Sequence, residues 1–106
     1  MTDRLVLVVS LWLKDDDIAG FEAFEHAAAD LMTAHGGRID SVIRCAADPD
    51  GPFEVHLVSF PSVAAYDAYR ADPRAVELRA RRERVLARTE VWRGAALPAY
   101  GSATEV

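Results

Sequence analysis

Hydrophobic and polar positions change their spacing several times along the chain, and each change marks a predicted element. Residues 4–14 are mostly aliphatic and β-branched, without glycine or proline, which is typical of a buried strand. Residues 21–35 carry apolar side chains at spacings of three and four, which predicts an amphipathic helix. The run Asp15-Asp16-Asp17 supplies its N-cap, and Gly36-Gly37 ends it.

The following segments predict a hairpin. Residues 38–46 and 53–60 again have the composition of strands. Between them stands Asp48-Pro49-Asp50-Gly51, which has the chemistry of a type I turn. Because this connection is short, we expect the two strands to pair antiparallel.

The last third of the chain predicts a broken helix and a final strand. Ser62 is an expected N-cap, and Asp72-Pro73 is a second helix-start signal. Two helical pieces are therefore expected, residues 63–70 and 73–88, with a kink between them. Residues 89–93 form a short strand.

The order strand, helix, strand, strand, helix, strand is that of a ferredoxin-like βαββαβ fold. We therefore predict an α+β domain with a four-stranded antiparallel sheet over residues 1–94. Residues 95–106 are rich in Ala, Gly and Ser and are expected to be an arm or a flexible tail.

Two helices cover only one face of such a sheet, so the other face must meet water or a partner. We assign odd strand positions to the helix-covered face: Leu5, Leu7, Val9, Leu11, Ile39, Ile43, Cys45, Phe53, Val55, Leu57 and Val91. Even positions then form an open face with a large apolar patch. This face predicts a homodimer that packs sheet against sheet into an α/β barrel. The expected interface residues are Trp12, Val8, Val58, Trp92 and Arg44.

The composition of the chain excludes several classes of protein. The 106 residues, 51% of them hydrophobic, suffice for one folded domain and exclude disorder, and the longest apolar run is too short to span a membrane. The single Cys45 excludes a disulfide framework, and no two histidines have tight metal-ligand spacing, so no metal is expected. The N-terminus resembles a leader but has no small-residue cleavage site after its apolar run. We therefore expect a cytoplasmic protein that does not bind membranes.

The net charge of −5 hides an asymmetry, since residues 73–106 carry seven arginines against four acidic residues. Four of the six residues 79–84 are arginine. This run could be a nucleic-acid-binding helix or a solvated face with internal ion pairs. No aromatic side chain in it could stack on a base, and the acidic chain favours the solvated face, so no nucleic-acid partner is expected.

Three strings resemble a known superfamily: FEVHLVSFPS at residues 53–62, AYDAYRADPR at 65–74 and TEVWRG at 89–94. They are similar to the dimeric α/β-barrel proteins, in particular to small bacterial members of unknown function related to antibiotic-biosynthesis monooxygenases. The resemblance implies a cofactor-independent enzyme, monooxygenase-like or cyclase- or isomerase-like, that acts on a small aromatic or polyketide-like compound. The alternative is a non-catalytic, small-molecule-binding or stress-associated homodimer.

Two departures from that superfamily limit the transfer of activity. Its quinone-forming monooxygenases and haem degraders use an asparagine near the site, and this chain contains no asparagine. The haem-degrading branch takes its axial histidine from the second helical region, and residues 62–88 contain no histidine. Neither mechanism carries over residue by residue, and no cofactor is expected.

His56 is the foremost candidate for catalysis. It lies two residues after Glu54 on a strand, so both side chains share a face, and the carboxylate could orient the imidazole as a general base. Alternatively, His56 is an interface residue that hydrogen-bonds Glu54 or Arg44. His26 is expected to be solvated, and His35 to cap its helix.

The helices add candidates for ligand binding. Tyr66 and Tyr69 share a helix face and could hold or protonate a phenolic or enolate ligand; otherwise they pack at the edge of the core. Arg79 and Arg82 interrupt apolar stripes and could clamp a carboxylate; otherwise their stems cover the core. Phe24 is the last of the predicted ligand-binding residues.

The size of the space between helices and sheet decides between these interpretations. A cavity of roughly 300 Å³ or more with His56, Tyr66 or Arg82 would favour chemistry or binding, whereas a helix–sheet space filled by aromatic and aliphatic residues would remove the site. The expected fillers are Phe21, Phe24, Leu31 and Leu78.

Overall fold

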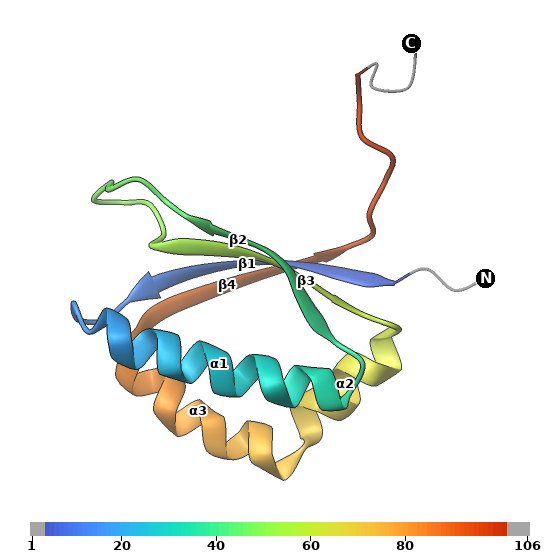
Figure 1. The fold of residues 1–106 in the computed structure, drawn as a ribbon, viewed down its shortest axis with the longest axis horizontal. Helices are drawn as coiled ribbons and strands as arrows, with labels where there is room; N and C mark the ends of the chain where they lie inside the picture. The colour runs from blue at the N-terminus through green and yellow to red at the C-terminus, as the bar shows by residue number, and fades with distance from the viewer. Residues whose placement is uncertain (1–3, 102–106) are drawn as a thin grey trace.

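A computed structural model describes residues 4–101 of the chain. In chain order the elements are β1 (Leu5–Leu13), α1 (Ile18–Ala34), β2 (Arg38–Arg44), β3 (Glu54–Phe60), α2 (Val63–Ala71), α3 (Pro73–Val85) and β4 (Leu86–Gly94). The strands form one antiparallel sheet in the order β2-β3-β1-β4. All three helices lie on one face of it (Figure 1). The predicted α+β, ferredoxin-like βαββαβ architecture is confirmed.

The predicted turn and cap residues take the positions expected of them. The Asp17 carboxylate accepts a hydrogen bond from the Gly20 amide at 2.9 Å and caps α1. Gly36, with a φ of +77°, follows the helix end in the left-handed conformation that favours glycine. In the hairpin, the Gly51 amide donates to the Asp48 carbonyl at 3.2 Å, which closes the predicted turn.

Asp72 separates α2 from α3. It ends α2 and at the same time caps α3, where its carboxylate accepts a hydrogen bond from the Arg74 amide at 2.8 Å. The predicted kink is therefore a complete break. α3 also ends at Val85, earlier than predicted, because Leu86 is already extended, buried and paired with Leu13 of β1.

Strand β3 presents the opposite face from the one predicted. Cross-strand partners share a face, and β3 pairs Val58 with Leu7 and Glu54 with Leu11. Its even positions therefore point at the helices, where Val58 is only 1% exposed, whereas Leu57 lies on the open face. The assignment of Val58 to a dimer interface was wrong. The same correction moves Val55 to the open face.

A β-bulge in β2 changes which side chains of that strand face the helices. Ile39 pairs with Val58 but Ser41 pairs with Leu57, so Asp40 is an extra residue in the ladder. Before the bulge Ile39 faces the helices, as predicted. Beyond the bulge, the even-numbered residues face the helices and the odd-numbered ones face the open side. Arg44 therefore points toward the helices, and Ile43 points to the open face. Arg44 therefore does not lie on the sheet face where a partner was expected.

The core consists of two buried clusters between sheet and helices. One contains Leu11, Phe21, Phe24, Ala28 and Leu86, and the other contains Leu7, Val58 and Phe60. Val9 and Met32 contact both clusters. Among the described helices, none is long and apolar enough to cross a membrane. The predicted arm can be followed to Gly101, with all of residues 95–101 exposed, and its last five residues lie outside the described range.

Candidate functional site

A cavity of about 130 Å³ lies between the helices and the sheet. We call it the inner cavity. Most of its lining is apolar and comes from β1, α1 and β3, and its polar lining residues are Glu25, His56, Tyr66, Tyr69, Arg82 and Thr89. A second hollow of about 310 Å³, the outer hollow, adjoins it. The two share Phe24, Ala28, Tyr66, Tyr69 and Arg82, so they form one continuous site between α1, α2, α3 and the sheet.

The structure brings most of the predicted site residues together around this space. His56, Tyr66, Tyr69, Arg82 and Phe24 all line the inner cavity, and Arg79 lines the outer hollow. Phe21 lies in the core beside Phe53, with the two rings 5.6 Å apart and edge to face. The predicted fillers do not fill the helix–sheet space, because the two hollows remain open there. The inner cavity is smaller than the predicted size of roughly 300 Å³, whereas the outer hollow, with Tyr66 and Arg82 in its lining, reaches about 310 Å³.

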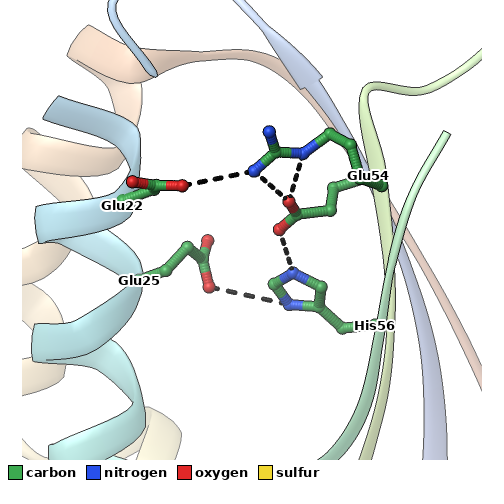
Figure 2. Close-up of polar contacts among 5 residues, drawn as sticks. Glu22, Glu25, Glu54 and His56 are labelled. Carbon is green, nitrogen blue, oxygen red and sulfur yellow. Dashed lines mark hydrogen bonds and ion pairs between the residues drawn. The ribbon is translucent and has the colours of Figure 1, made fainter. Parts of the chain in front are cut away.

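The reversed face of β3 places Glu54 and His56 inside the molecule. His56 Nε2 lies 2.7 Å from Glu54 Oε1, and both side chains are nearly fully buried (Figure 2). The other oxygen of Glu54 accepts a hydrogen bond from Arg44 Nε at 2.6 Å and forms an ion pair with Arg44 Nη2, also at 2.6 Å. The Arg44 cation offsets the negative charge of Glu54, and the contact with Glu54 Oε1 orients the His56 ring through Nε2. In the tautomer whose Nε2–H donates to Glu54, Nδ1 carries no proton and can act as a base.

Glu25 of α1 completes the buried group and was missed by the sequence analysis. Its Oε1 lies 3.7 Å from His56 Nδ1, on the opposite side of the ring from Glu54 (Figure 2). Burial raises the pKa of Glu25 to about 7, the nearby His56 lowers it, and Glu54 raises it further. Near neutral pH this carboxyl can therefore both release and accept a proton. A signal was present, since Glu25 stands four residues after Phe21 and three before Ala28, on the apolar face of α1.

The two tyrosines belong to an aromatic group at the other end of the cavity. The Phe60 ring lies 5.2 Å from Tyr66 and 5.4 Å from Tyr69, centre to centre. Burial, together with the charge of Glu25, raises the pKa of Tyr69. Tyr69 therefore remains a neutral phenol at ordinary pH and can donate a hydrogen bond to a ligand oxygen.

The remaining predicted residues lie away from the cavity. Trp12, Val8 and Trp92 are on the open face, as predicted, and the Arg88 guanidinium lies 4.3 Å from the Trp12 ring centre. His26 is exposed, and His35 ends α1 with Nε2 2.8 Å from Asp72 Oδ2. Within residues 4–101, no three His, Cys, Asp or Glu side chains are arranged to hold a metal ion.

The arrangement is suited to moving a proton on a bound organic molecule. His56 Nδ1 can accept a proton, and Glu54 with Arg44 stabilises the resulting imidazolium. Glu25 can exchange a proton at neutral pH, and Tyr69 can stabilise an oxyanion. The apolar lining around these groups fits an aromatic or aliphatic ligand skeleton.

Comparison of the sequence with models of protein families and with curated proteins gives no match. The fold, in contrast, matches solved structures over nearly the whole chain. A protein of unknown function from Rhodopseudomonas palustris has a TM-score of 0.77 and 17% identity, covering 93% of this chain and 86% of that protein. A DABB family protein with a ferredoxin-like fold from Mesorhizobium loti has a TM-score of 0.70 and 18% identity, covering 90% and 98%.

A third match is SnoaB, a cofactor-independent oxygenase from Streptomyces nogalater, with a TM-score of 0.73 and 13% identity, covering 94% of this chain and 99% of SnoaB. Other matches include antibiotic biosynthesis monooxygenases and a dimeric protein of ferredoxin-like fold. At these identities the likeness concerns the fold. The chain has the ferredoxin-like fold that DABB and antibiotic-biosynthesis monooxygenase proteins share, in agreement with the resemblance predicted from its sequence strings.

Proposed function

We propose that the chain is a cofactor-independent enzyme that transfers a proton on a small aromatic or polyketide-like compound. The observation that carries the proposal is a buried cluster of Glu54, His56 and Glu25, which the more exposed Arg44 binds through Glu54. His56 and Glu25 of this cluster line the inner cavity. Buried charged groups are costly, and a series of them beside a cavity is more readily explained by chemistry than by stability. The cofactor-independent oxygenase among the structural neighbours supports the same class of activity.

In the proposed reaction, His56 Nδ1 takes a proton from a hydroxyl or an acidified C–H of the substrate. The electron pair of that bond stays on the substrate as a phenolate or enolate, and the phenol of Tyr69 stabilises the oxyanion. In a cyclase- or isomerase-like reaction, protonated Glu25 or His56 returns a proton at another atom. In a monooxygenase-like reaction, the carbon of the enolate instead forms a C–O bond to dioxygen, which is reduced to a peroxide anion. That anion takes the proton back from His56, and the O–O bond then breaks with loss of water, so that a CH₂ group and O₂ become a carbonyl and H₂O.

Hydrogen exchange on a model ketone tests the proton transfer directly. 1-Tetralone is incubated with the protein in D₂O, and NMR follows loss of the proton signal beside the carbonyl. We expect wild type to accelerate exchange and His56→Ala to reduce the enzymatic rate about 100-fold or more. His26→Ala removes an exposed histidine of α1 and serves as the matched control. Equal rates in wild type and His56→Ala would refute the proposal.

The open face of the sheet supports a homodimer as part of the proposal. It exposes Val8, Leu57 and Trp92, which pair side by side across β3, β1 and β4, and Ile43 on β2. An apolar stripe of this extent is typical of a protein interface. One structural neighbour is described as a dimeric protein of ferredoxin-like fold.

A non-catalytic binding protein is the second candidate, and the small, mainly apolar inner cavity favours it. In that case the buried charges only orient a ligand. A thermal-shift screen of phenols and aromatic ketones separates the two. Ligands that raise the midpoint of wild type but show no exchange or turnover would favour the binding protein over the enzyme.

A further inference from the structure

Three arginines line the outer hollow without a carboxylate to neutralise them. They are Arg70 of α2 and Arg79 and Arg82 of α3. Among residues 4–101, none of the three forms an ion pair, whereas Arg38, Arg44, Arg74 and Arg88 each bind an acidic side chain. In a chain with a net charge of −5, three uncompensated cations in one hollow constitute a local positive site.

Local contacts hold part of this arginine group in place. Arg79 Nη2 donates a hydrogen bond to the Arg70 carbonyl at 3.2 Å, across the break between α2 and α3. The Arg70 guanidinium lies 5.7 Å from the centre of the Tyr66 ring, within the range of a cation–π contact. Arg82 lines both the outer hollow and the inner cavity. The group therefore lies beside the inner cavity, with the Tyr66 ring next to Arg70.

The inner cavity has the opposite electrostatic character. Its volume of about 130 Å³ is close to that of a protein cavity that binds a single benzene ring. Its polar end carries Glu25, next to the buried carboxylate of Glu54. An anionic group would be repelled from that end and attracted to the arginines, whereas an uncharged ring fits the apolar lining. The site thus fixes the direction in which an aromatic acid can bind.

We infer that the site takes aromatic monocarboxylic acids, with the ring in the inner cavity and the carboxylate held by Arg70, Arg79 and Arg82. Arginine is suited to this role, because its planar guanidinium binds carboxylates through two parallel hydrogen bonds. The inference names the substrate class of the proposed enzyme and rests on that proposal for the chemistry at His56. Recognition of the acid itself requires no catalysis.

A matched pair of ligands tests the inference. 4-Hydroxybenzoate and 4-hydroxybenzamide have nearly the same size and shape and differ in the charge that the arginines would bind. Titrations followed by amide NMR shifts, up to 10 mM ligand, measure both affinities in wild type, Arg82→Gln, Arg70→Gln and Arg81→Gln. Arg81 is the control, because it is exposed on the same helix but lines a separate hollow.

We expect wild type to bind the acid about tenfold more tightly than the amide, which corresponds to one charge-assisted hydrogen bond. Arg82→Gln and Arg70→Gln should each remove most of that preference, Arg81→Gln should keep it, and added salt should weaken it. Equal binding of acid and amide by wild type, no binding of either at 10 mM, or a preference that survives both substitutions would overturn the inference.

The two proposals fail separately. If the acid is preferred but His56→Ala does not change hydrogen exchange on 1-tetralone, the anion site stands and the proposed catalysis falls. If exchange depends on His56 but the acid is not preferred, the catalysis stands and the substrate class is wrong.

Discussion

Glu25 shows how one residue joins helix packing to chemistry. It occupies the apolar face of α1 and so is carried under the sheet, where its side chain is only 16% exposed. Desolvation disfavours its charged form, and its pKa rises from 4.5 to about 7. The folded protein therefore holds a proton that the unfolded chain releases between these two values.

This difference predicts a pH dependence of stability. The contribution of protonated Glu25 is fully present below pH 4.5 and is lost as the pH rises through about 7. Wild type should lose up to about 3 kcal/mol of unfolding free energy over that window relative to Glu25→Gln. Urea denaturation at several pH values between 4.5 and 8 measures the difference. Parallel curves for the two proteins would contradict the raised pKa.

Arg44 gives a second prediction at the residue scale. It keeps the buried Glu54 carboxylate compensated, and Arg44→Met would leave that charge without its cation. We expect the thermal midpoint to fall by about 5 °C or more. Glu22→Gln is the matched control, because it removes the weaker, exposed contact of Arg44 at 3.3 Å and should shift the midpoint by less than about 2 °C. Similar shifts for both variants would show that the Glu54 contact has no special weight.

At the scale of elements, the joint between α2 and α3 supports the outer hollow. The Asp72 side chain caps α3 and binds His35 at the end of α1, and its backbone amide ends α2, so one residue connects three helices. Asp72→Asn keeps a good cap but loses the charge, whereas Asp72→Ala loses both. We expect thermal scans to show Asp72→Ala with a midpoint lower by about 5 °C and Asp72→Asn with a smaller loss. Equal losses would mean that the cap contributes little.

The elements themselves were largely predictable, because caps, turns and periodicity are local signals. Which side chains of each strand face the helices was not predictable in the same way. In β3 both parities carry apolar side chains, and the polar pair Glu54 and His56 pointed to the wrong face. Only the pairing with β1, and the contacts of Arg44 and Glu25, show that this polar pair is buried. In β2 the bulge at Asp40 reverses the alternation without a mark in the sequence.

At the scale of the whole molecule, contacts between distant elements, which local sequence signals do not encode, explain why Glu25 was missed at the site. His56, the tyrosines and Arg82 stood out by residue type, and the fold brought them to one cavity. Glu25 carried a signal of burial, its place on the apolar face of α1, but no signal of chemistry, because a glutamate on a helix is ordinary until the sheet covers it. Its role depends on the distance to His56 across two elements, which no spacing along the chain encodes.

The open face leads to the prediction for the whole assembly. Trp92 is 67% exposed in the single chain and lies beside Val8 in the sheet. A stable pair of copies buries about 800 Å² on each partner, which an apolar sheet face of this kind can supply. Light scattering at micromolar concentration should therefore give twice the chain mass of 11.6 kDa.

Trp92→Glu would place two like charges near the interface and remove an apolar anchor, so we expect it to halve the measured mass. Leu57→Glu should do the same from β3. Val76→Glu introduces the same charge at a half-exposed position on α3, on the helix side of the sheet, and should leave the dimer intact. Circular dichroism confirms that each variant is folded. A wild-type protein of 11.6 kDa would refute the dimer, and a dimer that survives both substitutions would place its interface elsewhere.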